Sequence, residues 1–134
     1  KTNSVFLVHA HGDNVSKLLI ASNFKNCIGT TQTKPLGKIE NFGGFTDGDR
    51  CVFLANHFHA KQIILFGMDF GTTIGKYSKT KPKDRKVKIK KLARGKKLLE
   101  WLASKTKANL YSTSKPVKGF QTITYKELDD IIIT

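Results

Sequence analysis

Four polar side chains follow an apolar stretch near the start of the chain. They are His9, His11, Asp13 and Asn14. Imidazole, carboxylate and carboxamide groups this close together could bind a cation, donate to phosphate oxygens or move a proton. The alternative is that Asp13 or Asn14 only caps a helix that begins near Val15.

Two later loops also place acids beside glycines, at residues 41–50 and 67–71. The chain has only ten acids against 24 lysines and arginines, so acids gathered in loops are informative. Hard cations such as Mg2+ prefer oxygen ligands and keep waters and substrate phosphates in their shell. The sequence therefore predicts a Mg2+ site, with the candidate ligands Asp13, Asp47, Asp49 and Asp69.

The loop at residues 41–50 also has features of an anion-binding turn. Gly48 would let the backbone approach a ligand closely, and the amino end of a helix attracts anions. Thr46 or Asp47 is the predicted amino cap of that helix. A P-loop motif is absent from the sequence. Metal and positive charge together favour phosphoryl transfer, where catalysis is largely positioning and electrostatics.

A zinc site is the competing metal hypothesis. The alternation of His9, His11 and Asp13 partly resembles the metal-binding run of metallo-β-lactamase-like enzymes. Asn14 stands where that run needs another histidine, so Mg2+ is favoured over zinc. We expect His57 and His59 to be ordinary surface or partly buried histidines.

The net charge of +14 raises nucleic acid as an alternative partner. Residues 76–97 hold 12 of the 24 basic residues against the single acid Asp84. A basic helix and loop here would meet the phosphates of a substrate, although a charge run is more often a solvated face. The few aromatics near this run, mainly Tyr77, do not form a stacking platform for bases.

Strands that alternate with helices are needed to position these loops. Apolar runs predict strands at 5–8, 26–31, 61–66 and 109–112. The spacing of apolar residues predicts helices at 17–24, 51–58 and 88–105, and a last helix through Leu128 to about Ile132. Thr124, three residues before Glu127, forms a capping-box pattern. This order predicts an α/β fold, a three-layer αβα arrangement with a Rossmann-like, mostly parallel sheet. Its loops would gather at the carboxyl ends of the strands, where such sheets bind ligands.

Length and composition suit one α/β domain over residues 1–134, which we expect to be the carboxyl-terminal part of a longer protein. No apolar run approaches the roughly 20 residues of a membrane helix, so no membrane partner is expected. Cys27 and Cys51 lie in apolar stretches and are predicted to be buried free thiols. Free thiols fit a reducing cytoplasm.

Three motifs, in this order, carry a resemblance to a known family. They are residues 9–14, 41–50 and 67–71, followed by the basic segment 75–78. Together they resemble the carboxyl-terminal catalytic half of the archaeal 6-hydroxymethyl-7,8-dihydropterin pyrophosphokinases, a family related to the motility accessory factor glycosyltransferases. The similarity extends through most of the chain, to the helix at 98–102.

This resemblance implies transfer of pyrophosphate from ATP to the hydroxymethyl group of a reduced pterin, with Mg2+, releasing AMP. The pathway would be tetrahydromethanopterin or folate-type biosynthesis. By position, the implied catalytic residues are His9, His11, Asp13 and Asp47. The implied residues for substrate or nucleotide are Asn14, Gly44, Thr46, Gly48, Arg50 and Lys76.

Other functions stay open at this stage. One is a related transferase that acts on thiamine or a nucleotide-sugar. Another is a non-catalytic domain that binds nucleic acid or a phosphate ligand through residues 76–97. An assembly of identical copies is also left open.

Overall fold

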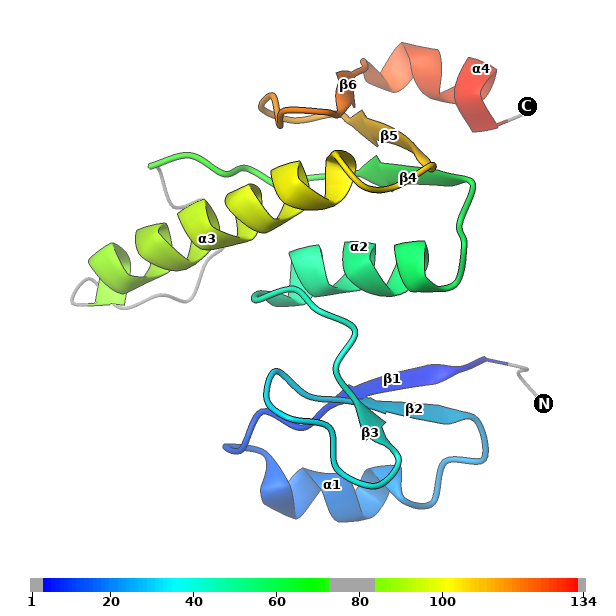
Figure 1. Ribbon diagram of the computed structural model, residues 1–134, viewed down its shortest axis with the longest axis vertical. Coiled ribbons are helices and arrows are strands. Elements are labelled where there is room, and N and C mark those ends of the chain that lie inside the picture. Colours follow the sequence, from blue (N-terminus) through cyan, green and yellow to red (C-terminus); the bar gives the residue numbers. More distant parts are fainter. Residues whose placement is uncertain (1–3, 73–83, 133–134) are drawn as a thin grey trace. The chain divides into compact units, whose positions relative to one another are not determined.

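The structure is a computed structural model that describes residues 4–72 and 84–132 (Figure 1). The chain forms two compact units, unit 1 at Lys1–Gly43 and unit 2 at Gly44–Thr134. Unit 1 combines one helix with parallel strands, and unit 2 combines several helices with parallel strands. The predicted α/β class and parallel strand pairing are therefore confirmed. The single domain over residues 1–134 and the Rossmann-like sheet stay predictions.

Unit 1 is a three-stranded parallel sheet with one helix. Its elements are β1 (Phe6–His9), α1 (Val15–Ala21), β2 (Cys27–Thr30) and β3 (Ile39–Glu40). The strand order is β1-β2-β3, with Phe6 opposite Cys27 and Thr30 opposite Glu40. This register sets His9, the last residue of β1, beside Thr30, the last residue of β2.

Two apolar side chains of β1 are only partly buried. Phe6 and Leu7 are 46% and 49% exposed. Unit 1 contains one described helix, α1, for the two faces of its sheet. Phe6 does pack on Phe24, with ring centroids 4.5 Å apart.

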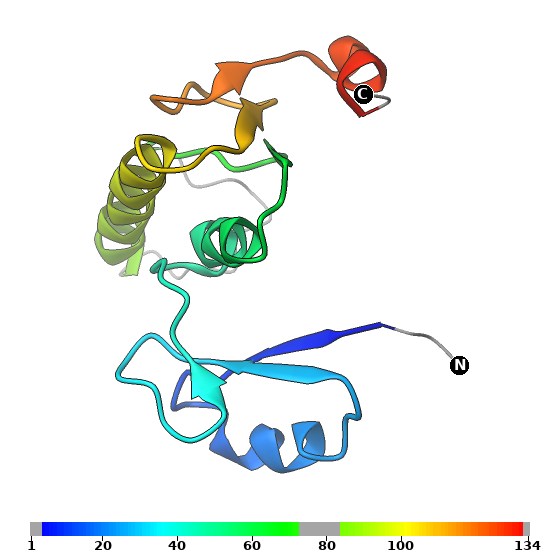
Figure 2. The same ribbon diagram turned by 45° about the vertical axis from the view of Figure 1, so that its right-hand side comes forward.

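Unit 2 contains the remaining elements. They are α2 (Asp47–His57), β4 (Gln62–Leu65), α3 (Arg85–Ala103), β5 (Asn109–Ser112), β6 (Gln121–Thr122), a 3-10 turn (Tyr125–Glu127) and α4 (Leu128–Ile132). The sheet order is β4-β5-β6 and both pairings are parallel. Figures 1 and 2 show α2 and α3 on the same side of this sheet.

The core of unit 2 lies between the sheet and these two helices. It consists of Val52, Ile63, Leu65, Leu99, Leu102, Leu110, Val117 and Phe120. Leu99 of α3 is completely buried. Fully burying a side chain of this size contributes about 1.5–3 kcal/mol. This packing fixes α2 and α3 against the sheet and so determines where the loops of unit 2 lie.

Both cysteines are free, as predicted, but both are exposed. The predicted burial of Cys27 and Cys51 is wrong, because Cys27 lies at the start of β2 and Cys51 lies on the outer side of α2. None of the helices in the described parts of the chain is long and apolar enough to span a membrane.

Candidate functional site

The first candidate loop, at residues 9–14 of unit 1, is held in shape by Asn14. Its side-chain amide donates to the carbonyl oxygen of His9 at 2.7 Å, and its Oδ1 accepts from the backbone N–H of His11 at 3.1 Å. Asn14 is the residue before α1, yet its side chain makes no capping bond to that helix. Gly12 completes the turn with φ +97°, a conformation that favours glycine. Asn14 therefore orders this loop, and the structure does not support helix capping as its sole role.

The two histidines of this loop differ in their surroundings. His9 is half-buried, and its Nδ1 lies 3.0 Å from Thr30 Oγ1 and 3.1 Å from the Thr30 carbonyl oxygen. His11 is exposed, and its Nδ1 lies 3.3 Å from Asp13 Oδ1. An imidazole beside a carboxylate can take up or release a proton while the carboxylate orients the ring. Thr30, which anchors His9 to the neighbouring strand, could not be predicted as a site residue from any local pattern.

Asp49 lies at the start of α2 as part of a capping box with Thr46. Asp49 is completely buried, and its oxygens accept from the backbone N–H groups of Phe45 at 2.6 Å and Thr46 at 2.8 Å. The Thr46 hydroxyl also donates to Asp49 Oδ1. A carboxylate here satisfies backbone donors before the helix and complements the helix dipole. These contacts favour a capping role, and metal binding by Asp49 stays a prediction.

Gly44 and Arg50 hold the turn that precedes α2. Gly44 has φ +83°, and a Cβ there would lie 2.6 Å from Arg50 Cα, so only glycine fits this approach. Arg50 is 8% exposed, and its Nη2 donates to the Phe45 carbonyl oxygen at 3.3 Å. The ligand-binding roles of these two residues stay predictions.

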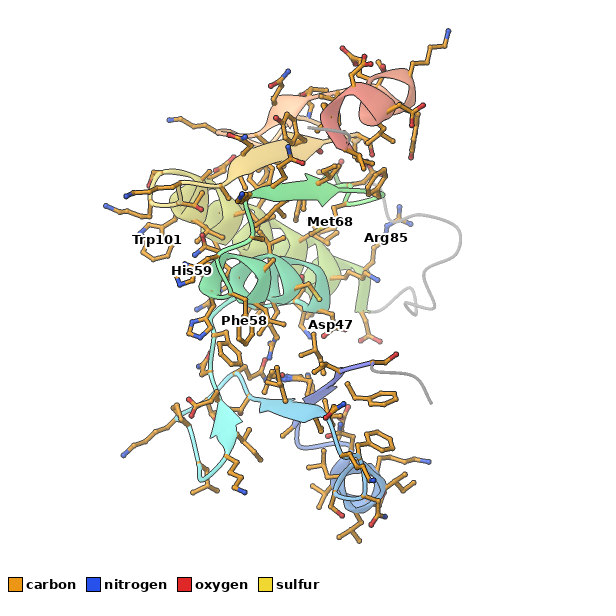
Figure 3. The ribbon with its side chains drawn as sticks, turned by 90° about the vertical axis from the view of Figure 1, so that its right-hand side faces the viewer. Asp47, Phe58, His59, Met68, Arg85 and Trp101 are labelled. Carbon is orange, nitrogen blue, oxygen red and sulfur yellow. The ribbon has the colours of Figure 1, made fainter. Side chains whose placement is uncertain are left out.

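Two of the predicted loops lie next to each other within unit 2. A Cβ on Gly48 would lie 2.7 Å from Met68 Cε, so the first turn of α2 packs on the segment that follows β4. Figure 3 shows Asp47 and Met68 at the corresponding ends of α2 and β4. Asp47 and Asp69 are both exposed. The structure therefore brings the loops of these two acids together at the carboxyl end of β4.

Lys115 is a candidate residue that the sequence reasoning missed. It follows β5, and a Cβ on Gly71 would lie 2.7 Å from Lys115 Nζ. Its ammonium group therefore lies against the glycine-rich segment after β4. Its position in the sequence could have indicated it, because Lys115 closely follows a strand and ligands bind at the carboxyl ends of parallel strands.

The other predicted site residues belong to different units or lie outside the described residues. Over residues 4–72 and 84–132, no three His, Cys, Asp or Glu side chains gather as metal ligands. Lys76 lies outside the described residues. His9, His11, Asp13 and Asn14 belong to unit 1, whereas the other described candidates belong to unit 2. A single site formed by all three loops stays a prediction.

The family model described as 6-hydroxymethylpterin diphosphokinase MptE-like matches residues 1–75. Three archaeal relatives are each named 6-hydroxymethyl-7,8-dihydropterin pyrophosphokinase. The relative from Pyrococcus furiosus is 46% identical over 115 residues, covering 83% of this chain and 50% of its own length. The relative from Methanocaldococcus jannaschii is 46% identical over 116 residues, covering 78% and 48%.

The third relative, from Methanothermobacter thermautotrophicus, is 45% identical over 109 residues, covering 76% of this chain and 47% of its own length. This chain thus spans about half the length of the relatives it matches. No solved structure matches it.

Proposed function

The chain belongs to the 6-hydroxymethylpterin diphosphokinase MptE-like family, and from this membership we propose that the protein containing it transfers pyrophosphate from ATP to 6-hydroxymethyl-7,8-dihydropterin. The observation that carries the proposal is the common name of the three relatives, which are 45–46% identical to this chain. The tetrahydromethanopterin or folate-type pathway, the cytoplasmic location and a homo-oligomer are further predictions.

In the proposed reaction the hydroxyl oxygen of the pterin bonds to the β-phosphorus of ATP. The bond from that phosphorus to the oxygen that bridges the α- and β-phosphates breaks, and the bridging oxygen leaves on AMP. The hydroxyl proton passes to a base. Such a reaction needs an aligned acceptor, a proton acceptor and groups that stabilise charge on the phosphate oxygens.

His11 and Asp13 are the proposed groups that accept this proton. They are an exposed imidazole and carboxylate, 3.3 Å apart between Nδ1 and Oδ1, with 50% and 76% of their side chains exposed. Asn14 holds the backbone of His11 in place through its hydrogen bond to the His11 N–H. His9, anchored on Thr30, is the proposed donor to a phosphate oxygen.

Asp47 and Asp69 are the acids that fit Mg2+ best within unit 2. Both are exposed, and their loops are neighbours through the packing of Gly48 on Met68. Exposed Asp13 is a further candidate, whereas buried Asp49 fits poorly because backbone and hydroxyl donors already occupy its oxygens. Bound Mg2+ would neutralise charge on the phosphates.

Backbone and lysine groups are the proposed phosphate contacts of unit 2. Gly48 lies in the first turn of α2, where N–H groups favour an anion. Lys115 adds a positive charge beside Gly71. Gly44 and Thr46 would act by shaping this turn, and Arg50 by holding the carbonyl group of Phe45. Lys76 is proposed as an additional cation from the sequence alone.

The test is a product assay with the full-length protein, ATP, the reduced hydroxymethylpterin and Mg2+. We expect AMP as the nucleotide product, and formation of ADP would contradict the proposal. Asp47→Asn removes a proposed metal ligand and is expected to lower kcat/KM by about 100-fold or more. Asp84→Asn, at an exposed acid that precedes α3, is the matched control and is expected to leave kcat/KM unchanged. Equal turnover of both variants would exclude the proposed role of Asp47.

Nucleic-acid binding is the second candidate function, because α3 carries eight lysines and arginines against one acid, Glu100. Lys86, Lys90 and Lys97 are exposed on this helix. A steep salt dependence of RNA or DNA binding, lost when these lysines are neutralised and without pterin turnover, would favour this function. Thermal-shift screening with pterin, thiamine and nucleotide-sugars separates the related transferases.

A further inference from the structure

Gly95 is a buried glycine in the interior of α3, where glycine is less favourable than alanine. A Cβ at this position would lie 3.0 Å from Asp49 Oδ1 and 3.3 Å from Asp49 Cγ. The lack of a side chain therefore leaves room for the Asp49 carboxylate between the two helices. A larger residue would have to displace a group that is completely buried.

The Asp49 carboxylate holds the turn that leads into α2. It accepts from the N–H groups of Phe45 at 2.6 Å and Thr46 at 2.8 Å. Arg94, the neighbour of Gly95, contacts the same turn, with its guanidinium carbon 4.7 Å from the centre of the Phe45 ring. Two successive residues of α3 thus lie against the segment that precedes Asp47.

We propose that Gly95 and Asp49 are positioning residues, which together fix the turn at residues 44–48 and the direction of the exposed Asp47 side chain. Gly95 does this by allowing the carboxylate to reach its backbone donors. The catalytic consequence rests on the proposed function, in which Asp47 serves phosphoryl transfer. The coupling between Gly95 and Asp49 does not depend on it.

The coupling is tested by whether Gly95→Ala raises or lowers the unfolding midpoint, first in the wild-type protein and then in the Asp49→Ala variant. Gly95→Ala alone is expected to lower the unfolding midpoint, although glycine to alanine normally stabilises a helix. In the Asp49→Ala background the same change is expected to raise the midpoint, because the obstructing carboxylate is gone. A rise in both backgrounds would overturn the proposal, since the two residues would then act independently.

The backbone N–H groups of Phe45 and Thr46 provide a second readout without any substrate. Gly95→Ala is expected to move both amide signals in the NMR spectrum and to speed their hydrogen exchange, because their acceptor is displaced. Unchanged signals would contradict the proposed link. If Gly95→Ala alone does not fold, the double variant with Asp49→Ala and Gly95→Ala still tests the coupling. It is expected to be more stable than Asp49→Ala, and an equal or lower midpoint would refute the coupling.

The positioning role is tested by kinetics of the full-length protein well below its unfolding midpoint. Gly95→Ala is expected to lower kcat at least about 10-fold with little change in the KM for the pterin, because the reacting geometry is disturbed. Ala93→Gly is the matched control, since it weakens the same helix at an exposed position. Its kcat is expected to stay at the wild-type value.

The proposed function and the positioning role of Gly95 can fail independently of each other. If the wild-type protein has no pyrophosphokinase activity, the proposed function fails, while the midpoints and amide signals still decide the coupling. If the wild type is active and Gly95→Ala keeps its kcat, the positioning role is wrong and the proposed function stands.

Discussion

Asn14 orders the first candidate loop through both the oxygen and the nitrogen of its side-chain amide. Removing this side chain should therefore loosen the loop rather than α1. Asn14→Ala removes two hydrogen bonds, each contributing about 1 kcal/mol. We predict faster hydrogen exchange at the His11 amide, by about 10-fold or more. Exchange of the Leu19 and Ile20 amides in α1 should stay unchanged, because Asn14 makes no side-chain cap.

Asn23→Ala is the control for this measurement, because Asn23 lies in the same unit after the end of α1. It should leave the exchange of His11 unchanged. Faster exchange throughout α1 with an unchanged His11 amide in Asn14→Ala would mean that Asn14 is a helix cap after all.

At the residue scale, local patterns placed the polar residues in loops but did not reveal their contacts with distant segments. Thr46 was a predicted amino cap and is the capping residue of α2. Asp49 was assigned to a metal, although its spacing from Thr46 also fits a capping box. Its burial against Gly95 could not be predicted, because the two residues are 46 positions apart and no local pattern reveals their contact.

At the scale of elements, the strands and helices with long apolar patterns were predicted well. The run at 61–66 became β4, and the run at 109–112 became β5 with the predicted bounds. The two-residue strands β3 and β6 were missed, because they are too short to show a periodicity. Helix α3 begins at Arg85, before the predicted Lys88, since charged residues conceal the apolar spacing of its first turn.

The predicted capping box near the end of the chain is present. Thr124 donates to Glu127 Oε2 from its backbone N–H at 2.6 Å and from its hydroxyl at 2.7 Å. These bonds, the backbone one foremost, hold the pKa of the Glu127 carboxyl below its ordinary value. A lowered pKa means that the ionised form stabilises the folded turn. This stabilisation is present above the unfolded-state pKa of Glu127 and is lost as the pH falls through its lowered folded-state pKa.

We therefore predict that an NMR titration finds the pKa of Glu127 below the ordinary glutamate value. Thr124→Ala should raise this pKa only partly, because the backbone N–H remains as a donor. A pKa of Glu127 at or above the ordinary value in the wild type would contradict the capping box as the structure has it.

At the scale of the whole molecule, the net charge of +14 and the acidic loops favour anionic ligands held with a cation. Ordered motifs indicated the family, and the relatives' common name supports the proposed reaction. The role of each acid could not be read from the sequence, because exposure distinguishes Asp47 and Asp69 from Asp49. Exposure depends on packing between distant segments.

The most direct test of the proposed reaction follows one oxygen atom. The full-length protein would be given the reduced hydroxymethylpterin, Mg2+ and ATP that carries oxygen-18 only in the bridge between the α- and β-phosphates. Attack on the β-phosphorus predicts that the heavy oxygen remains in AMP while the pterin gains a diphosphate. ADP with a pterin monophosphate, or a pterin joined to AMP with release of labelled pyrophosphate, would contradict the proposed transfer.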